Sequence, residues 1–289
     1  MSNPNALVQA HLKAGRFIAV DGLQAFVREA GQGEAVLCIH GVPSSSFLYR
    51  KMLAELAAKG YRGIAFDLPG LGFSDRPEDF DYTWTGLGKW SVKACQVLGL
   101  DKFHLVIHDL GGPVGLEIAA ALPERILSLT ILNTILANLG SFKKPIVMKP
   151  FEWKGIGELY LKTLVTPLFQ QLMYLQGVQQ KSEFGHEEAE AWVSMLKQKD
   201  QGHAFLKIMR CFEATPEKEQ LYTQVVKDLN IPKQIIWGAK DPALPARKFA
   251  YPLQKQLGIE RLSMVPSKHF LQEDCAPEIV ERFVEMLQD

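Results

Sequence analysis

A predicted strand ends at a single carboxylate, Asp109, and glycines follow almost at once. Residues Phe103–Ile107 are mostly apolar, which is the pattern of a buried strand, whereas the Ala-rich segment Val114–Leu122 predicts a helix. Gly111 and Gly112 lie between the two and permit a tight turn. A strand, a sharp turn and a helix in this order push the intervening side chain out of the sheet. We therefore expect Asp109 to be exposed at the strand end and rigidly held.

The same alternation of strand and helix runs along most of the chain. It is typical of a mostly parallel sheet with helices on both faces. The first two strands differ, because the short Asp21-Gly22 turn between them predicts an antiparallel hairpin. The predicted strands are Phe17–Val20, Gln24–Arg28, Ala35–Ile39, Gly63–Phe66, Phe103–Ile107, Leu127–Leu132, Gln234–Trp237 and Leu262–Val265. The predicted helices are Ser46–Lys59, Trp84–Leu98, Val114–Leu122, Ala246–Leu257 and Pro277–Leu287.

One long segment interrupts this alternation. Between Thr134 and about Thr215 the strand pattern disappears, and aromatic and methionine residues recur at helical spacing. A helical insertion between two strands of such a sheet predicts a lid over the strand ends, where ligands bind in open α/β folds. The sequence therefore predicts an α/β core in two parts, residues 1–134 and 216–289, with a helical cap at residues 135–215.

Charge and cysteine content restrict the expected partners. Lysine and arginine together number 32, and so do aspartate and glutamate, so no net charge draws the chain to nucleic acid or to a membrane surface. A small apolar substrate and water are the expected partners. The four scattered cysteines predict reduced thiols and a cytoplasmic location, and neither a signal peptide nor a membrane span is predicted. The sequence predicts no oligomeric state.

Further polar residues lie directly after predicted strands. His40 follows the third strand, Asp241 lies just beyond the seventh, and His269 lies just beyond the eighth. Because the carboxyl ends of parallel strands meet at one edge of a sheet, we expect these side chains to lie near Asp109.

Five short motifs contain these residues in a fixed order along the chain. They are His40-Gly41-x-Pro43, Asp67-x-Pro69-Gly70-x-Gly72-x-Ser74-Asp75-Arg76-Pro77, Asp109-x-Gly111-Gly112, Gly238-x-x-Asp241 and His269-Phe270-x-Gln272-Glu273-Asp274. Through these motifs the chain resembles the haloalkane dehalogenase and epoxide hydrolase branch of the α/β-hydrolase superfamily. The resemblance covers nearly all of the chain outside the insertion.

The resemblance implies an α/β-hydrolase fold with an inserted helical cap, and it implies a role for each motif residue. Asp109 would be the nucleophile, His269 the base that activates water, and Asp241 the carboxylate that orients His269. The backbone amides of Val42 and Leu110 would form the oxyanion hole. The resemblance calls for no metal and no organic cofactor.

The chemistry of a carboxylate nucleophile points in the same direction. Attack by Asp109 on an ester or amide carbonyl would form an anhydride, which is more reactive than the substrate. Attack on saturated carbon forms a stable alkyl ester, which water can hydrolyse with the help of His269. The expected substrates are therefore small to medium apolar carbon electrophiles, such as strained rings or halides.

The leaving group is where the motifs depart from the family pattern. Haloalkane dehalogenases carry a tryptophan directly after the nucleophile to hold the departing halide, and this chain has Leu110 there. Epoxide hydrolases use two cap tyrosines as acids, and Tyr160 and Tyr174 are the candidates here. His108, just before the nucleophile, also resembles the epoxide hydrolase form. We therefore favour epoxide hydrolysis over dehalogenation, with a non-catalytic small-molecule-binding homologue as the alternative from another functional class.

The side chains expected around the substrate come from both the core and the cap. For His40 and His108, hydrogen bonding to loops beside the site is the alternative role. Asp274 competes with Asp241 as the partner of His269, but its position predicts a cap on the last helix instead. The expected substrate-binding residues are His40, His108, Trp153, Tyr160 and Tyr174.

Overall fold

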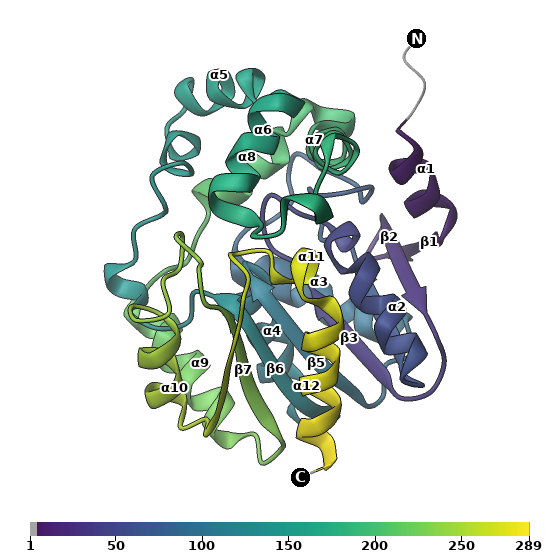
Figure 1. Ribbon diagram of the computed structural model, residues 1–289, viewed down its shortest axis with the longest axis vertical. Helices are drawn as coiled ribbons and strands as arrows, with labels where there is room; N and C mark the ends of the chain where they lie inside the picture. Colours follow the sequence, from purple (N-terminus) through teal and green to yellow (C-terminus); the bar gives the residue numbers. More distant parts are fainter. Residues whose placement is uncertain (1–4, 289) are drawn as a thin grey trace.

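An eight-stranded sheet runs through the middle of the molecule in the order β1-β2-β4-β3-β5-β6-β7-β8 (Figure 1). The computed structural model describes residues 5–288. β1, β2 and β4 pair antiparallel, and the other neighbours pair parallel. The strands are β1 (Gly15–Val20), β2 (Leu23–Ala30), β3 (Ala35–Ile39), β4 (Arg62–Phe66), β5 (Phe103–Asp109), β6 (Ile126–Thr134), β7 (Lys233–Gly238) and β8 (Arg261–Val265). All eight predicted strands are confirmed.

The predicted hairpin between β1 and β2 turns at Asp21 and Gly22. Both residues have positive φ angles, 52° and 81°, as the tightest hairpin turns require. The central strands are buried on both faces, which explains their nearly continuous apolar sequences. In β3, Val36 and Cys38 pack on one side of the sheet and Leu37 and Ile39 on the other.

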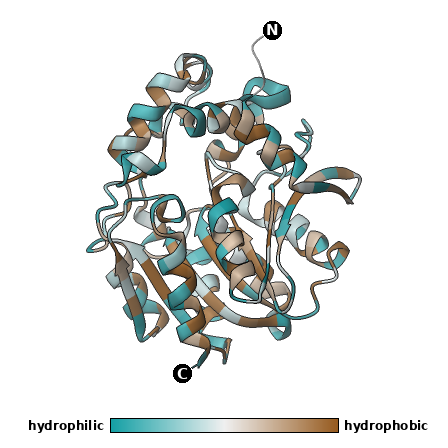
Figure 2. Cartoon of the chain, turned by 45° about the vertical axis from the view of Figure 1, so that its right-hand side comes forward, coloured by the Kyte–Doolittle hydropathy of each residue, from teal (hydrophilic) through white to brown (hydrophobic). Residues whose placement is uncertain are grey.

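Helices cover both faces of the sheet (Figure 1). They are α2 (Arg50–Ala58) and α12 (Ala276–Gln288) on one face, and α3 (Trp84–Val97), α4 (Gly111–Ala121), α9 (Pro216–Asp228) and α10 (Ala250–Leu257) on the other. α2 and α12 contact each other, and Leu53 and Phe283 belong to the apolar cluster on their side of the sheet, while α3, α4, α9 and α10 pack in series. Figure 2 shows the result, with largely brown strands between helices that mix brown and teal. The predicted α/β fold is confirmed.

Several helix boundaries differ from the sequence prediction. The segment Ser46–Tyr49 forms a 3-10 turn before α2, and α10 begins four residues later than expected. The helices α1 (Ala6–Lys13) and α9 were not predicted. The start of α9 carries a recognisable signal, because the Thr215 hydroxyl accepts a hydrogen bond from the Lys218 amide and Pro216 occupies the first turn.

The segment from residue 135 to residue 215, here named the cap segment, is helical. Its helices are α5 (Ile156–Thr163), α6 (Thr166–Leu172), α7 (His186–Gln201) and α8 (His203–Arg210), with a π-helical turn at Met173–Gly177. Figure 1 shows these helices together at one end of the sheet. The segment lies between β6, which ends at Thr134, and α9, which begins at Pro216. Its division from the core as a separate domain stays a prediction.

The cysteines do not pair with one another. Cys38, Cys95 and Cys275 are buried, Cys211 is partly buried, and all four are free thiols, as predicted. Between residues 5 and 288, none of the helices combines the length and the apolar character needed to cross a bilayer.

Candidate active site

Asp109 lies at the sharp turn between β5 and α4. Its φ angle of 51° is in the left-handed region, which ordinary residues rarely occupy. The two glycines that follow are required by close packing. A Cβ on Gly111 would lie 2.1 Å from the Ile39 carbonyl oxygen, and one on Gly112 would lie 1.9 Å from the Thr134 hydroxyl oxygen. The predicted strand, turn and helix junction is confirmed.

The side chains of Asp109, His269 and Asp241 meet at the carboxyl ends of three strands. His269 Nε2 lies 3.3 Å from Asp109 Oδ2, and His269 Nδ1 lies 2.8 Å from Asp241 Oδ2. The imidazole therefore bridges two carboxylates. Asp241 and His269 are almost fully buried, while part of Asp109 remains accessible.

Asp241 is held by hydrogen bonds from three other groups. The backbone amides of Ala243 and Leu244 donate to its Oδ1 at 2.8 and 2.9 Å, and the side-chain amide of Asn133 donates to its Oδ2 at 2.6 Å. Asn133 is itself fixed, because its oxygen accepts from the Gly238 amide. This network fixes the orientation of the carboxylate that faces His269.

Charge balance in this cluster favours a protonated imidazole. Burial disfavours the charged form of His269, but the charges of Asp241 and Asp109 outweigh burial and raise its pKa to about 10. Burial also disfavours both carboxylates, yet His269 lowers the pKa of Asp109 and of Asp241 below the usual aspartate value. At neutral pH the cluster therefore holds one positive charge between two negative charges.

A backbone donor faces the other oxygen of Asp109. The Val42 amide donates to Asp109 Oδ1 at 2.7 Å, and partial burial strengthens this bond. Leu110 directly follows Asp109 at the N-cap position of α4, with its side chain packed into the core. The structure thus brings Val42 to the carboxylate, as the sequence prediction of an oxyanion hole requires.

An apolar cavity of about 120 Å³ opens above these residues, between the strand ends and the cap segment. Core residues such as Val42 and Leu244 line it together with cap residues such as Phe151, Leu164 and Met209. The polar side chains in its lining are those of Asp109, Lys144, Tyr160, Gln176 and His269. Such a cavity suits an apolar molecule that meets a few polar groups.

The three cap residues predicted to contact substrate lie in different places. Tyr160 lines the cavity. Trp153 does not, and about half of its side chain is exposed to solvent. Tyr174 also lies outside the lining, because its hydroxyl donates to the Phe184 carbonyl and accepts from the Gln170 amide. Helical spacing alone did not reveal which face of each helix points inward.

His40 and His108 are fully buried beneath the cavity rather than in its lining. His40 donates from Nδ1 to the Gly41 carbonyl and accepts from the Leu68 amide, so it joins two loops. His108 donates from Nε2 to the carbonyl of His269. Burial lowers the pKa of His40, and burial together with His269 lowers that of His108 to about 3, so both rings are neutral. These contacts correspond to the alternative role in loop structure and not to substrate binding.

Sequence reasoning missed several cavity residues, including Gln176 and Phe270. Phe270 follows His269 in the last motif, so the motif itself was the available signal. Gln176 lies in the π-helical turn, a rare distortion that periodicity does not reveal. This turn lies against the His269 loop, because the Phe270 amide donates to the Gly177 carbonyl at 2.8 Å.

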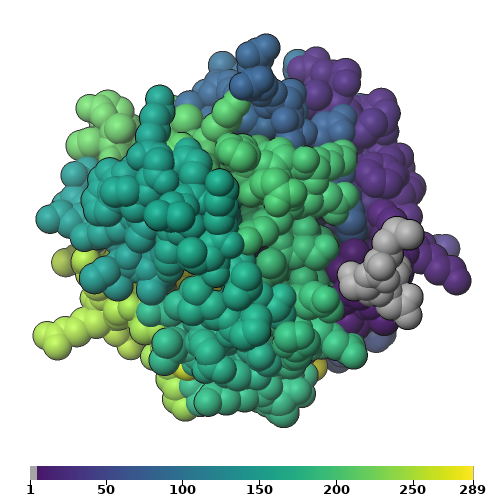
Figure 3. Space-filling view, turned by 90° about the horizontal axis from the view of Figure 1, so that it is seen from above, coloured from purple at the N-terminus to yellow at the C-terminus, as the bar shows by residue number. Residues whose placement is uncertain are grey.

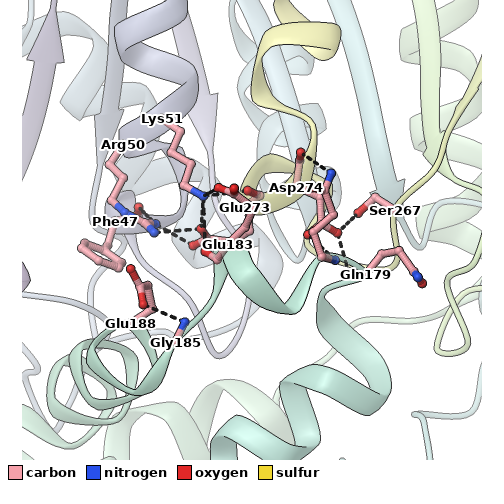
Figure 4. Close-up of polar contacts among 11 residues, drawn as sticks. Phe47, Arg50, Lys51, Gln179, Glu183, Gly185, Glu188, Ser267, Glu273 and Asp274 are labelled. Carbon is pink, nitrogen blue, oxygen red and sulfur yellow. Dashed lines mark hydrogen bonds and ion pairs between the residues drawn. The ribbon is translucent and has the colours of Figure 1, made fainter.

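Asp274 does not cap the last helix, so that prediction is wrong. Its carboxylate accepts hydrogen bonds from the backbone amides of Gln179 and Gln180 and from the Ser267 hydroxyl (Figure 4). The neighbouring Glu273 does not cap a helix either, because its carboxylate accepts hydrogen bonds from Arg50. Both carboxylates follow His269 on one short segment, and Asp274 ties this segment to the cap.

Glu273 forms a buried ion pair beside this junction. Its carboxylate is fully buried and accepts two hydrogen bonds from Arg50, at 2.5 and 2.8 Å, while Lys51 lies 3.6 Å away and also bonds Glu183 of the cap segment (Figure 4). Two parallel bonds of this kind fix the geometry as well as the charge. The pair therefore anchors α2 to the segment that follows His269.

Arg50→Met is expected to lower the free energy of unfolding by about 3 kcal/mol, because it leaves the Glu273 carboxylate buried with only Lys51 nearby. Urea denaturation measures the loss. Arg16→Met, which breaks the exposed pair with Glu29, is the control and should cost less than about 1 kcal/mol. Adding Glu273→Gln to Arg50→Met should restore part of the stability. Equal losses for the two single variants would contradict the assignment.

Comparison with known proteins agrees with this geometry. A family model described as the alpha/beta hydrolase fold matches residues 34–276. YNR064C of Saccharomyces cerevisiae, described as an uncharacterized hydrolase, is 25% identical over 93% of this chain and 95% of its own. The haloalkane dehalogenase of Mycolicibacterium paratuberculosis is 27% identical over 89% of this chain and 84% of its own. The crystal structure of epoxide hydrolase VrEH1 from Vigna radiata has a TM-score of 0.76 at 20% identity and covers 95% of this chain and 97% of that chain. The strand order, the turn at Asp109 and the match over most of the length lead to one conclusion: the chain is a hydrolase of the α/β hydrolase fold family.

Proposed function

We propose that the chain hydrolyses apolar carbon electrophiles through a covalent alkyl ester on Asp109. The observation that carries this proposal is the placement of the two carboxylate oxygens. Oδ1 accepts the Val42 amide, while Oδ2 faces His269 beside the apolar cavity. Oδ2 is thus left to attack a substrate carbon, and its attack breaks the bond from that carbon to the leaving group.

Water completes the reaction in a second step. It attacks the carbonyl carbon of the Asp109 ester, gives a proton to His269, and releases the alcohol as the carboxylate re-forms. In the tetrahedral intermediate the former carbonyl oxygen of the ester, Oδ1, becomes anionic. The Val42 amide already points at this oxygen, and with the Leu110 amide it would stabilise the charge; one such donor is typically worth about 3 kcal/mol of barrier.

The charge on His269 fits this order of steps. In the free enzyme Asp241 and Asp109 together keep the imidazole protonated. Esterification removes the charge of Asp109, so the pKa of His269 falls once the covalent step is complete. The imidazole then becomes available as a base at the stage where a base is needed.

Epoxides are the favoured substrate class because Tyr160 offers a proton donor in the cavity. Burial raises the pKa of its hydroxyl, so the phenol stays protonated and can donate to a ring oxygen that becomes an alkoxide. Leu110 has no donor for a departing halide. Dehalogenation is the second candidate, supported by the full-length similarity to a haloalkane dehalogenase and by the Gln176 amide in the cavity lining.

A substrate panel tests the proposal directly. Terminal epoxides, bromoalkanes and chloroalkanes of increasing chain length are incubated with the protein, and released diol or halide is measured. We expect diol from epoxides at a higher kcat/KM than halide from haloalkanes. Binding of these compounds without any product would favour the non-catalytic alternative.

Tyr160→Phe is expected to lower kcat/KM for epoxides by about 100-fold, the usual contribution of a positioned acid, with a much smaller effect on bromoalkanes. Steady-state kinetics on both substrate classes measures the difference. Tyr174→Phe is the matched control, since its hydroxyl bonds the Phe184 carbonyl outside the cavity. Equal effects of the two variants on epoxides would remove Tyr160 from the proposed role.

A further inference from the structure

Exposed apolar side chains gather on the outer side of the cap segment. Eleven large apolar side chains are exposed in residues 5–288, and seven of them lie between residues 146 and 175. That stretch is about a tenth of the chain, so the distribution is strongly uneven. Scattered exposed apolar residues need no explanation, but a concentration of them does. The seven, here named the outer cap face, are Ile146, Trp153, Ile156, Leu159, Val165, Leu168 and Leu175.

Three of these residues, Ile156, Leu159 and Leu168, belong to α5 and α6. Figure 1 shows α5 and α6 at the top of the molecule, above the strands. Figure 3, seen from above, shows the teal atoms of this part of the chain over much of that surface. The outer cap face therefore lies where a flat partner can approach without meeting the α/β core.

The cap is apolar on its inner side as well. Phe151, Tyr160 and Leu164 line the cavity, while Ile156 and Leu159 of the same stretch face solvent. A single layer of chain thus separates the apolar cavity from the apolar outer surface.

The charges around the outer cap face are predominantly positive. Residues 143–175 contain five lysines and two glutamates, a net charge of +3 in a chain whose total is zero. Both glutamates are paired, Glu152 with Lys144 and Glu158 with Arg210. The other lysines, Lys143, Lys149, Lys154 and Lys162, form no ion pair with any residue from 5 to 288.

We propose that the outer cap face binds the surface of membranes that contain anionic phospholipids. Exposed apolar side chains interspersed along the chain with lysines have the chemistry of interfacial binding. A second copy of this chain fits less well, because pairing two such faces would bring like charges together. The expectation of no membrane contact was based on the total charge of the chain. A total of zero does not reveal the local excess of positive charge in residues 143–175. If the proposed function holds, an apolar substrate also has a short path from the lipid to the cavity.

Vesicle sedimentation with the full chain tests this proposal. Vesicles of phosphatidylcholine alone are compared with vesicles that contain roughly 30% phosphatidylglycerol, which gives an anionic surface. We expect binding to rise about tenfold with the anionic lipid and to fall at high salt, as surface electrostatics require. Ile156→Ser with Leu159→Ser should abolish binding, and Lys154→Glu with Lys162→Glu should remove its dependence on phosphatidylglycerol.

The matched control is Val97→Ser, which removes an equally exposed apolar side chain at the end of α3 and should leave binding unchanged. Light scattering reports self-association of each variant. Dimerisation through the outer cap face without vesicle binding, or equal binding by the Ile156→Ser, Leu159→Ser variant, would overturn the proposal. Hydrolysis of a water-soluble epoxide by that variant should match the parent, so failure of membrane binding and failure of the proposed function give different results.

Discussion

Asp109→Ala is expected to abolish turnover of every substrate, with a loss of about 10⁴-fold or more in kcat/KM, as removal of a nucleophile typically produces. The physical reason is that no other carboxylate lines the cavity within the described residues, so no other group can form the ester. Steady-state release of diol or halide measures the effect. Circular dichroism and thermal unfolding check that the variant is folded, since Asp109 also contacts His269 and the Val42 amide.

Isotope labelling distinguishes a nucleophile from a general base at the same position. In a single turnover in heavy-oxygen water, the product should carry the original oxygen of Asp109, and the label should appear in the protein. Asp109→Asn is a useful second variant, because it keeps the shape of the side chain but lacks the negative charge that attacks carbon. Near wild-type turnover by either variant, or label that enters the product at once, would contradict the covalent step.

The sequence predicted the core of this site because short patterns and sheet topology are enough to do so. The residues around Asp109 predict a tight turn, because Gly111 and Gly112 follow it. The packing leaves no room for a larger side chain at either glycine. His269 and Asp241 lie beyond the ends of parallel strands, and such ends necessarily converge at one edge. Correct identification of the strands was therefore enough to predict that these side chains lie close together.

The cap could not be predicted in the same way, because nothing in its sequence defines which face of a helix points inward. Tyr160 and Tyr174 looked equivalent, yet one lines the cavity and the other bonds the Phe184 carbonyl. The π-helical turn that carries Gln176 has no periodic signature. Asp274 resembled a helix cap by position, but the backbone amides of the cap segment compete for the same carboxylate.

His269→Gln is expected to stop the reaction after the covalent step. Glutamine lacks a basic nitrogen, so it cannot accept a proton from the attacking water, whereas Asp109 can still attack the substrate. With a bromoalkane we expect one equivalent of bromide in a burst, and with either substrate class we expect a stable mass increase on the peptide that contains Asp109. Mass spectrometry after proteolysis measures the adduct. His108→Gln serves as the control, since His108 bonds the His269 carbonyl but lies outside the cavity lining, and it should still turn over.

The pH dependence of the two steps provides an independent check on this assignment. The first step needs an anionic Asp109. Burial raises the pKa of this carboxyl, but His269 outweighs burial and keeps the pKa below the usual aspartate value. Ester formation should therefore be insensitive to pH near neutrality. The second step needs a neutral His269. Its pKa is about 10 while Asp109 is charged and falls when esterification removes that charge, so hydrolysis of the ester should accelerate as pH rises through the lowered value. The ester should therefore accumulate at low pH in the parent protein, as it does at all pH values in His269→Gln. Rapid-quench measurement of the ester across pH tests this, and an ester level that does not change with pH would show that His269 is not the base.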